Sequence, residues 1–344
     1  MTSPATGATA EVAIGARLLL GIPLAKQILQ DVTRDLDRLR GRDPERDGTA
    51  SQSAELPGVS VIMVGGDPAS QVYASRILGN AERVGLPGRM VRLAVDASTS
   101  DVIRALEAEN ADRSVAGIIV QLPLPGQVEH RAVIEAIDPA KDIDGIHPYD
   151  AGLLALGYES FYPSCAEASV EILRWYGIKP AGMRAVVIGR SNVVGKPAEL
   201  LLLRENATVT VCHRQTRDLP GELRRADLIV VAAGSPGLVR GDMLQSGAAV
   251  VDCGINVLDG RIVGDVDMDS VRPVASALTP VPGGVGPLTN AILLEHLARA
   301  VRRQVQAGRP AGSAAEAALD ANKESAAVTD GSPNADGTAF AGSR

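Results

Sequence analysis

The chain has 344 residues, a length that favours two domains of ordinary size. Its hydrophobic content of 45% with only 2% aromatic residues indicates cores built from Ala, Val, Leu and Ile. The net charge of −7 argues against nucleic acid or an anionic membrane as partner, and the apolar stretches are too short for a membrane-spanning helix.

The first half of the chain begins as a helix and continues as alternating strands and helices. Apolar residues recur at helical spacing over 18–39, which predicts an amphipathic helix followed by a loose polar connection at 41–53. We expect strands at 59–64, 90–95 and 115–121, with helices at 70–85 and 98–109 between them. This alternation predicts a parallel sheet joined by right-handed crossovers.

A second α/β region is predicted to begin near Pro163. We expect a helix at 166–176, buried strands at 183–188, 208–213, 228–233 and 248–252, and a closing helix at 288–305. The four strands indicate a doubly wound, Rossmann-like sheet. The predicted fold class is therefore α/β, with two domains that each contain a mainly parallel sheet and flanking helices. Residues 1–12 and 307–344 are rich in small and polar residues, and we expect disordered tails there.

A glycine turn joins the strand at 183–188 to the next helix. The turn begins Gly189-Arg190-Ser191, so backbone N–H groups and a helix N-terminus can face a phosphate group. The spacing differs from the usual G-x-G-x-x-G pattern, and a plain strand-turn-helix crossover is the structural alternative.

The strand after this turn ends in a basic cluster of His213, Arg214, Thr216 and Arg217. An acid at this place would bind a free ribose 2′-hydroxyl, whereas basic side chains suit a 2′-phosphate. The sequence therefore favours NADP over NAD as cofactor. The alternative is that these arginines are solvated surface residues, which leaves NAD open.

Three further polar residues stand where strand ends and loops would gather them. They are Tyr73 near a helix start, Gln121 at a strand end, and Asp144 two residues after Asp142. Open α/β sheets bind ligands at the carboxyl ends of their strands, which favours a site here. Each residue also has a structural explanation, because Tyr73 suits a core, Gln121 a strand cap and the two acids a turn.

Cysteine and histidine usage indicates neither disulfides nor metal. Cys165, Cys212 and Cys253 show no CxxC spacing and suit a reducing cytosol as small buried residues. The N-terminus lacks a secretory signal, so we expect a cytoplasmic protein. Four scattered histidines argue against a metal site.

Together with the proline- and glycine-rich segment at 279–289, these motifs resemble the bifunctional methylenetetrahydrofolate dehydrogenase/cyclohydrolase family, known as FolD. The matching segments are 64–70 with Tyr73, 117–125, 141–148, 189–197, 251–256, 263–267 and 280–287. They occur in the family's order and cover roughly residues 18–300. The proline- and glycine-rich segment and the strand-end Gln-Leu-Pro-Leu-Pro are highly specific in combination.

The resemblance implies two domains with separate roles and a homodimer formed mainly through the nucleotide domain. Residues 13–160 together with 288–306 would form a folate-binding catalytic domain, and residues 161–287 an NADP-binding domain. Tetrahydrofolate derivatives would bind in the cleft between them.

The resemblance also implies roles for the residues at matching positions. Tyr73 would stack on the pterin and aminobenzoyl rings, while Gln121 and Asp144 would bind near the reacting centre and the pterin ring. These three are the candidate catalytic residues, and a carboxylate holds pterin N–H donors through charge-assisted contacts. Further candidates are Pro282, Gly283 and Gly284 for the substrate, and Gly189, Arg190, Ser191, Arg214, Thr216 and Ile255 for NADP.

This chain departs from the family at the active-site lysine. The lysine stands four residues after the tyrosine, one helical turn on, and that position is Ile77 here. Arg76 is adjacent, but one residue turns a helical side chain by about 100°. Arginine also keeps its charge, which makes it a poor proton shuttle. A local gap would bring Arg76 into register.

Two further departures border the implied cleft. Residues 163–166 read Pro-Ser-Cys-Ala where the family usually has Pro-Cys-Thr-Pro, and Asp150 stands where many members have Asn.

We therefore expect NADP-dependent oxidation of 5,10-methylenetetrahydrofolate to 5,10-methenyltetrahydrofolate, with weak or absent hydrolysis to 10-formyltetrahydrofolate. Hydride transfer depends mainly on alignment, whereas hydrolysis needs the proton transfer for which a tuned lysine is suited. Three alternatives stay open. They are a fully bifunctional enzyme in which Arg76 or a water network replaces the lysine, a folate- or NADP-binding protein without turnover, and an enzyme for a different one-carbon or pterin-like substrate.

Overall fold

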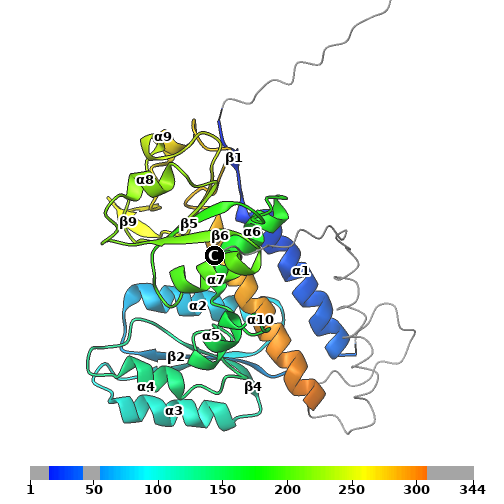
Figure 1. The fold of residues 1–344 in the computed structure, drawn as a ribbon. Helices are drawn as coiled ribbons and strands as arrows, with labels where there is room; N and C mark the ends of the chain where they lie inside the picture. The colour runs from blue at the N-terminus through cyan, green and yellow to red at the C-terminus, as the bar shows by residue number, and fades with distance from the viewer. Residues whose placement is uncertain (1–14, 42–54, 308–344) are drawn as a thin grey trace, which may run out of the picture. The chain divides into compact units, whose positions relative to one another are not determined.

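The computed structural model describes residues 15–41 and 55–307. Its main elements are two parallel sheets and the helices on their faces (Figure 1). Met1–Val301 form one compact unit and Arg302–Arg344 a second, of which 302–307 are described. The predicted tail at 1–12, all but the first residue of the predicted tail at 307–344, and nearly all of the predicted connection at 41–53 lie outside the described residues.

The larger sheet confirms the predicted Rossmann-like architecture. Its six strands in the described residues run in the order β1-β11-β8-β7-β5-β6, and every neighbouring pair is parallel. The strands are β1 (Arg17–Leu18), β5 (Arg184–Ile188), β6 (Thr208–Cys212), β7 (Leu228–Val231), β8 (Ala249–Asp252) and β11 (Ala277–Leu278). Strands β7 and β8 are buried at every residue, which explains why they read as continuous apolar runs.

The smaller sheet has β2 at its centre, in the order β3-β2-β4, and both pairs are parallel. Its strands are β2 (Gly58–Val64), β3 (Gly88–Leu93) and β4 (Val115–Val120), and its helices are α2 (Pro68–Arg83) and α3 (Thr99–Ala111). Figure 1 shows α2 and α3 on opposite faces of this sheet. A separate antiparallel hairpin joins β9 (Asn256–Leu258) to β10 (Arg261–Val263).

The remaining helices cover the sheets or connect them. They are α1 (Gly21–Leu39), α4 (His130–Glu135), α5 (Pro148–Ala155), α6 (Ser164–Trp175), α7 (Gly195–Arg204), α8 (Leu219–Leu223), a 3₁₀ turn (Gly241–Met243), α9 (Met268–Val271) and α10 (Val285–Ala307). None of the helices in the described ranges is long and apolar enough to cross a membrane.

Separate hydrophobic clusters fill the space between sheets and helices. On one face of the six-stranded sheet, Val187, Val230 and Val251 pack with residues of α1, α6, α7 and α10. On the other face, Ile229 and Val250 belong to a second cluster. Residues of β2 and β4 pack with α3 and α4 in a third cluster. The Ala-, Val- and Leu-rich composition of these clusters follows directly from the scarcity of aromatic residues.

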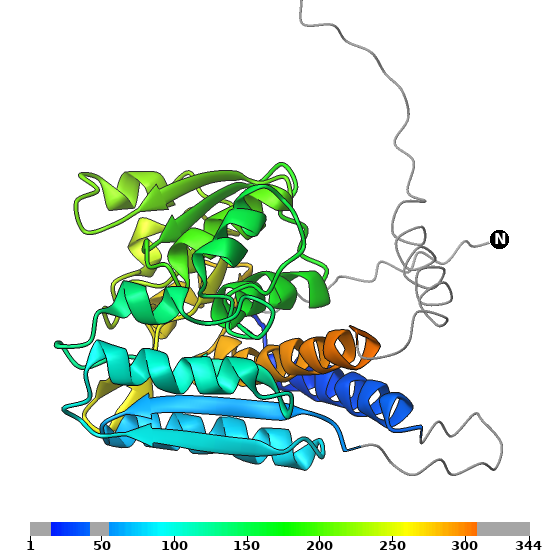
Figure 2. The same ribbon diagram turned by 90° about the horizontal axis from the view of Figure 1, so that it is seen from below.

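Helix α10 packs against parts of both sheets. Its first turns, including Leu288 and Ile292, lie in the cluster on the six-stranded sheet. Further along α10, Leu297 lies against Gly117 of β4. A Cβ added to Gly117 would stand 2.9 Å from the Cδ1 atom of Leu297. Helix α10 runs beside α1 in both orientations of the ribbon (Figure 1 and Figure 2). The Gly21 N–H at the start of α1 donates to the Gly283 carbonyl just before α10.

The predicted helix at 18–39 is wrong at its first residues. Arg17–Leu18 form strand β1 against Ala277–Leu278, and the Leu19 N–H donates to the Leu278 carbonyl at 2.9 Å. Pairing with a distant strand therefore overrides the local helical pattern until Gly21. At the other end of the chain, α10 runs from Val285 to Ala307 and is longer than the predicted helix at 288–305, so Ala307 does not belong to a tail.

Candidate active site

The start of α2 lies beside the end of β4. Asp67 caps the helix by accepting the Ser70 N–H at 2.8 Å, and Pro68 occupies a first-turn position where its missing N–H costs nothing. The buried Ser70 hydroxyl then donates to the Leu122 carbonyl at 3.5 Å. This contact brings the helix that carries Tyr73 next to the strand end that carries Gln121.

Tyr73 lies among charged and sulfur-containing groups. Burial raises the pKa of its phenol, the Asp144 carboxylate and Cys165 raise it further, and only Arg76 acts in the opposite direction. The phenol therefore stays protonated and available as a hydrogen-bond donor. The Asp144 carboxylate thus lies close enough to Tyr73 to act on its phenol.

Gln121 directly follows β4 and has an unused acceptor. Its backbone N–H donates to the Ile62 carbonyl at 2.8 Å, and its Nε2 donates to the Leu122 carbonyl at 3.1 Å. The amide oxygen Oε1 is buried and has no hydrogen-bond partner among the described residues. A buried acceptor without a partner is unfavourable unless a ligand or water satisfies it, which supports a binding role for this side chain.

Asp142 and Asp144 have different roles. Asp142 is fully buried, accepts the His147 N–H at 2.6 Å, and has a pKa raised to about 8 mainly by burial, so it is a neutral structural acid at neutral pH. Asp144 is only partly buried and interacts with the Ser164 hydroxyl at the start of α6. Burial raises its pKa, while His296 and Ser164 lower it. The turn explanation therefore fits Asp142, and the site explanation fits Asp144.

The segment that carries these acids is anchored from both sides. The Lys141 ammonium donates to the backbone carbonyls of Glu109, Asn110 and Asp112 at 2.7–3.1 Å, which fixes it to the end of α3. The His296 ring nitrogen Nδ1 on α10 lies 2.9 Å from the Ile143 carbonyl. The backbone that leads into Asp144 is therefore held at Lys141 and at Ile143.

The residues at the family's lysine position differ sharply in exposure. Ile77 is only 3% exposed and belongs to the packed interior. Arg76 is exposed and lies close enough to Tyr73 to affect its pKa. The ionisable side chain next to the family's lysine position on α2 is thus the guanidinium of Arg76, which does not release a proton at working pH.

The glycine turn before α7 has room only for glycine. Gly189 has a φ of +122°, and a Cβ there would collide with the Ala232 carbonyl. A Cβ on Gly195 would collide with the Gly189 carbonyl in the same way. The Ser191 hydroxyl accepts the Val194 N–H at 3.1 Å and the Gly195 N–H at 3.4 Å, which orders the turn. Such a compact backbone turn at a helix N-terminus fits a dinucleotide phosphate.

The other predicted cofactor residues lie in segments that follow strands β5, β6 and β8 of the same sheet. Arg190 and Arg214 are exposed, and Ile255 is 68% exposed one residue beyond Gly254. The Thr216 hydroxyl accepts the His213 N–H at 2.9 Å and so closes the turn after β6. Arg214 and Thr216 therefore follow the carboxyl end of β6, which pairs with β5 along its full length.

The predicted substrate residues before α10 form a tight turn. The Gly284 N–H donates to the Pro280 carbonyl at 2.7 Å, and the Gly283 carbonyl accepts the Gly21 N–H at 2.9 Å. Pro282 is exposed. Five residues after Gly284, on α10, Thr289 interacts with Cys165, which also acts on the phenol of Tyr73.

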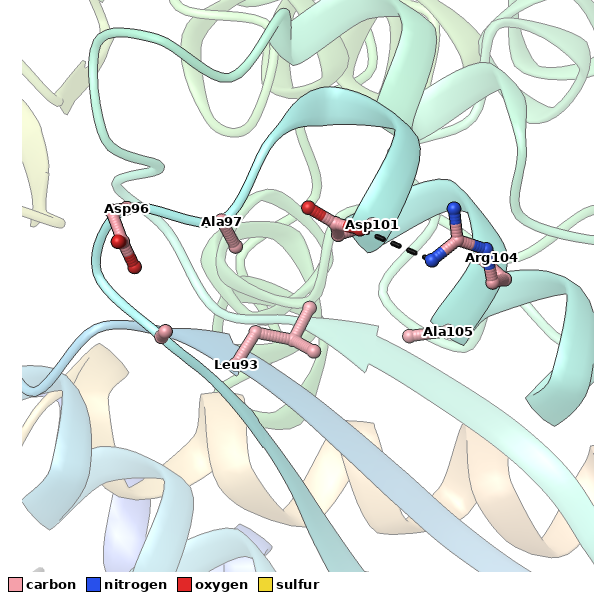
Figure 3. Close-up of a pocket in the computed structure, with 7 residues that line it drawn as sticks. Leu93, Asp96, Ala97, Asp101, Arg104 and Ala105 are labelled. Carbon is pink, nitrogen blue, oxygen red and sulfur yellow. Dashed lines mark hydrogen bonds and ion pairs between the residues drawn. The ribbon is translucent and has the colours of Figure 1, made fainter.

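A hollow elsewhere on the protein contains none of the predicted site residues (Figure 3). It is lined by Leu93, Ala94, Asp96, Ala97, Asp101, Arg104 and Ala105. Asp101 is already occupied there, because it accepts from Ser98 in a capping box and pairs with Arg104 at 3.1 Å. Within residues 15–41 and 55–307, no group of three or more His, Cys, Asp or Glu side chains is placed to hold a metal ion.

The sequence did not single out several residues that complete the site. Ser164 and Thr289 interact with Asp144 and Cys165 respectively, and His296 fixes the Ile143 carbonyl. Ser164 and Cys165 lie in the altered segment at 163–166, which was the available signal. His296 is a single buried polar residue in an otherwise apolar helix face, and its role depends on contacts that only the fold creates.

The fold and the site define an α/β protein in which a Rossmann-like sheet accompanies a smaller parallel sheet that carries polar site residues. Comparison with known proteins agrees. Residues 163–305 match the NAD(P)-binding domain, and residues 19–144 the catalytic domain, of the family described as tetrahydrofolate dehydrogenase/cyclohydrolase. The chain belongs to this family, which confirms the resemblance seen in the sequence.

Individual relatives match most of the chain. The bifunctional protein FolD of Roseiflexus sp. (strain RS-1) is 47% identical over 250 residues, which are 72% of this chain and 87% of that protein. The crystal structure of the bifunctional FolD from Campylobacter jejuni has a TM-score of 0.78 and 39% identity, and covers 84% of this chain and 99% of its own. The FolD of Trypanosoma brucei, complexed with NADP cofactor and inhibitor, has a TM-score of 0.77 and 35% identity, with coverage of 85% and 99%.

Proposed function

We propose that this protein is an NADP-dependent methylenetetrahydrofolate dehydrogenase whose cyclohydrolase activity is weak or absent. The observation that carries the proposal is the buried Ile77 one helical turn after Tyr73, beside the retained pair of Tyr73 and Asp144. The residues for binding and alignment are present, while the residue suited to proton transfer is replaced by a hydrocarbon side chain.

The oxidation requires positioning more than acid–base chemistry. When bound, NADP supplies the hydride acceptor for the methylene carbon of the substrate. In this proposal Asp144 holds the pterin's N–H donors, a role supported by its partly buried carboxylate, and Gln121 accepts a further hydrogen bond through its unpartnered Oε1. The Tyr73 ring would stack on the planar part of the folate, as the family resemblance implies. Holding donor and acceptor in line accounts for most of the rate gain that such a transfer needs.

The hydrolysis makes demands that this α2 does not meet. Water must be activated at the methenyl carbon, and protons must move to and from the ring nitrogens. Ile77 has no titratable group, and Arg76 keeps its proton. We therefore expect the methenyl product to leave the enzyme, or to hydrolyse slowly in solution, rather than to be converted on the protein.

The cofactor preference rests on the glycine turn and the exposed arginines. The turn at Gly189 suits the pyrophosphate of the cofactor. Arg190 and Arg214 are exposed, and their guanidinium groups suit a 2′-phosphate. The family relative from Trypanosoma brucei was solved with NADP. The proposed division into a folate-binding part at 13–160 with 288–306 and a cofactor-binding part at 161–287 places these groups in the second part.

Restoring the amine tests the proposal. We expect Ile77→Lys to gain hydrolysis of methenyltetrahydrofolate by about tenfold or more, since positioned acid–base groups contribute at least this much. Ile77→Met is the matched control, because its chain is long and flexible but has no charge, and it should gain nothing. Equal gains in both variants, or hydrolysis by the unmodified protein as fast as its oxidation, would contradict the proposal.

One observation favours a second candidate, the fully bifunctional enzyme. Arg76 is close enough to Tyr73 to lower the pKa of the phenol, so it is also close to the site. If Arg76 replaces the lysine, Arg76→Ala should abolish hydrolysis and spare oxidation. If our proposal holds, Arg76→Ala has little hydrolysis to remove.

We also propose that the protein forms a homodimer through the hairpin of β9 and β10. Val257, Leu258 and Ile262 on this hairpin are 73%, 53% and 51% exposed, an unusual cost for three large apolar side chains in one short element. Ile262→Asp should convert the dimer to a monomer in light-scattering measurements of mass. A monomeric unmodified protein would refute the dimer.

A further inference from the structure

The carboxylate of Asp265 holds the loop that follows β7. Its Oδ2 accepts the N–H groups of Ala233 and Gly234 at 2.7 and 2.8 Å, and its Oδ1 accepts the Ser235 N–H at 2.7 Å. Asp265 is fully buried, whereas Ala233 and Gly234 are exposed. Hydrogen bonds to a carboxylate are stronger than those between neutral groups. Three consecutive N–H groups of an exposed loop are therefore fixed from beneath by one buried acid.

The same carboxylate also reaches the loop that follows β8. The Asn256 Nδ2 donates to Asp265 Oδ1 at 2.8 Å. Gly254 lies directly against the acid, because a Cβ added there would stand 2.4 Å from Asp265 Cγ. Ile255, a candidate cofactor residue, is 68% exposed between these two contacts. Asp265 thus joins the loops that follow two neighbouring strands, β7 and β8.

The backbone of Asp265 is held in turn by the last residue of β8. Asp252 Oδ1 accepts the Asp265 N–H at 3.1 Å, and its Oδ2 accepts the Val266 N–H at 3.0 Å. The Asp265 carbonyl accepts the Val239 N–H at 3.1 Å. These contacts anchor Asp265 to the sheet, so its carboxylate is a fixed point to which the two loops are attached.

Both loops lie at the carboxyl ends of parallel strands, next to the glycine turn. A Cβ on Gly189 would stand 2.2 Å from the Ala232 carbonyl at the start of the loop after β7. In the sheet, β5 lies between β6 and β7, and β8 lies beyond β7. With the pyrophosphate at the Gly189 turn and the 2′-phosphate after β6, as proposed above, the nicotinamide half extends to the other side of β5, towards the loops after β7 and β8.

We propose that Asp265 is a positioning residue for NADP, which sets the loops at 232–235 and 253–256 in the arrangement that receives the nicotinamide half of the cofactor. This role rests on the proposed binding of NADP. Asp265 acts through the backbone of the two loops and through Asn256, because its own carboxylate is buried beneath them. It needs two acceptor oxygens and no proton transfer.

Hydrogen exchange in the protein without cofactor tests the positioning itself. We expect the amides at 233–235 to exchange slowly. In Asp265→Asn they should exchange at least about tenfold faster, because the amide offers one acceptor oxygen where the carboxylate offers two. Asp227→Asn is the matched control, since Asp227 accepts the Arg184 N–H at 2.9 Å at the amino end of the same sheet. Exchange at 233–235 that is equally fast in the unmodified protein and in Asp265→Asn would overturn the proposal.

Calorimetric titration then compares NADP with adenosine 2′,5′-bisphosphate, which lacks the nicotinamide half. Asp265→Asn should weaken NADP binding by about tenfold and leave binding of the bisphosphate almost unchanged. Asn256→Ala removes a single hydrogen bond to Asp265 and should weaken NADP binding by about threefold, so this variant decides the question if Asp265→Asn does not fold. Equal losses for NADP and the bisphosphate, or NADP binding as tight as in the unmodified protein, would overturn the proposal.

The unmodified protein separates this proposal from the proposed function. If it binds neither NADP nor the bisphosphate, the proposed cofactor is wrong, and the role of Asp265 towards it falls as well. If it binds both and the variants of Asp265 and Asn256 bind both equally well, the proposed cofactor stands and the positioning role alone is refuted.

Discussion

The imidazole of His296 on α10 lies 2.8 Å from the carboxylate of Glu167 on α6. Its other ring nitrogen lies 2.9 Å from the Ile143 carbonyl, which can only accept a hydrogen bond. The ring is 1% exposed and also contacts Phe161, whose centroid is 5.3 Å away. The ring therefore bridges the Glu167 carboxylate and the Ile143 carbonyl in a buried network next to Asp144. Helix α10 is thereby joined both to α6 and to the segment that carries the candidate folate-binding acid.

Neutralising Glu167 should destabilise the protein in a pH-dependent way. Burial raises the pKa of Glu167, but the charge and hydrogen bond of His296, with Arg299 and Arg174, outweigh it and lower the pKa below 4.5. The carboxylate therefore stabilises the fold above that pH, and this contribution is lost as the pH falls through the folded-state pKa. We expect Glu167→Gln to lower the free energy of unfolding by about 1–3 kcal/mol at neutral pH.

Urea unfolding across the acid range measures this difference. The gap between the unmodified protein and Glu167→Gln should close as the pH falls. Glu171→Gln is the control on the same helix, because Glu171 pairs with the largely exposed Arg174 and should change stability little. A gap that persists at acid pH would mean that Gln disturbs packing rather than the contact between the carboxylate and His296.

Asp142 should show the opposite pH dependence. Burial raises its pKa to about 8, so the folded protein keeps a proton that the unfolded chain releases near 3.8. The stabilisation from this neutral acid is complete below 3.8 and is lost as the pH rises through about 8. Asp142→Asn stays neutral and can still accept the His147 N–H, so it should gain stability relative to the unmodified protein as the pH rises.

The partly exposed Asp112 provides a control of opposite sign for that experiment. Hydrogen bonds from Ser114 and then Arg89 lower the pKa of Asp112 to about 2. Its stabilisation is present above its ordinary pKa and disappears only as the pH falls through about 2. Asp112→Asn should therefore lose stability at neutral pH and show no gain at alkaline pH. Parallel curves for the two variants would contradict both assignments.

A methyl group on Gly189 should damage the cofactor turn specifically. The residue has a φ of +122° and its Cβ would collide with the Ala232 carbonyl. We expect Gly189→Ala to cost about 1–3 kcal/mol in the free energy of unfolding and to weaken NADP binding by at least about tenfold. Calorimetric titration with NADP measures the binding. Gly152→Ala on α5, where an added Cβ meets nothing within 4 Å, should leave both quantities almost unchanged.

Removing Arg214 should change the choice between the two nicotinamide cofactors. If its exposed guanidinium contacts the 2′-phosphate, Arg214→Ala should raise the KM for NADP by about tenfold and leave the KM for NAD unaltered. Arg224→Ala, another exposed arginine of the same part of the chain, is the control. Equal effects on NADP and NAD would show that Arg214 does not read the phosphate.

The sequence predicted the parts of this fold whose signal is local. Strand β5, the glycine turn and α7 follow one another as an apolar run, a Gly-rich turn and a helical pattern, and the structure confirms them. Strand β1 has only two residues, Arg17 and Leu18, and its pairing with Ala277 and Leu278 leaves no periodic pattern to read. The sequence therefore predicted a helix from residue 18, although Leu18 pairs with a strand that is distant in the sequence.

The site shows the same limit at the level of single residues. Asp142 and Asp144 are two positions apart and looked alike, yet only the fold buries one completely and leaves the other beside Ser164 and Tyr73. The meeting of Glu167 with His296 joins residues 129 positions apart in the chain. No spacing rule could have paired them, because tertiary packing alone brings these elements together.

The most direct test of the central claim follows oxidation and hydrolysis separately in the unmodified protein. Purified protein is given 5,10-methylenetetrahydrofolate and NADP, with NADPH and the methenyl product measured independently, and methenyltetrahydrofolate is supplied alone in a parallel hydrolysis assay. We expect NADPH and methenyltetrahydrofolate to accumulate together while hydrolysis stays near the rate without protein. Enzyme-dependent hydrolysis at a rate that rivals oxidation would contradict it.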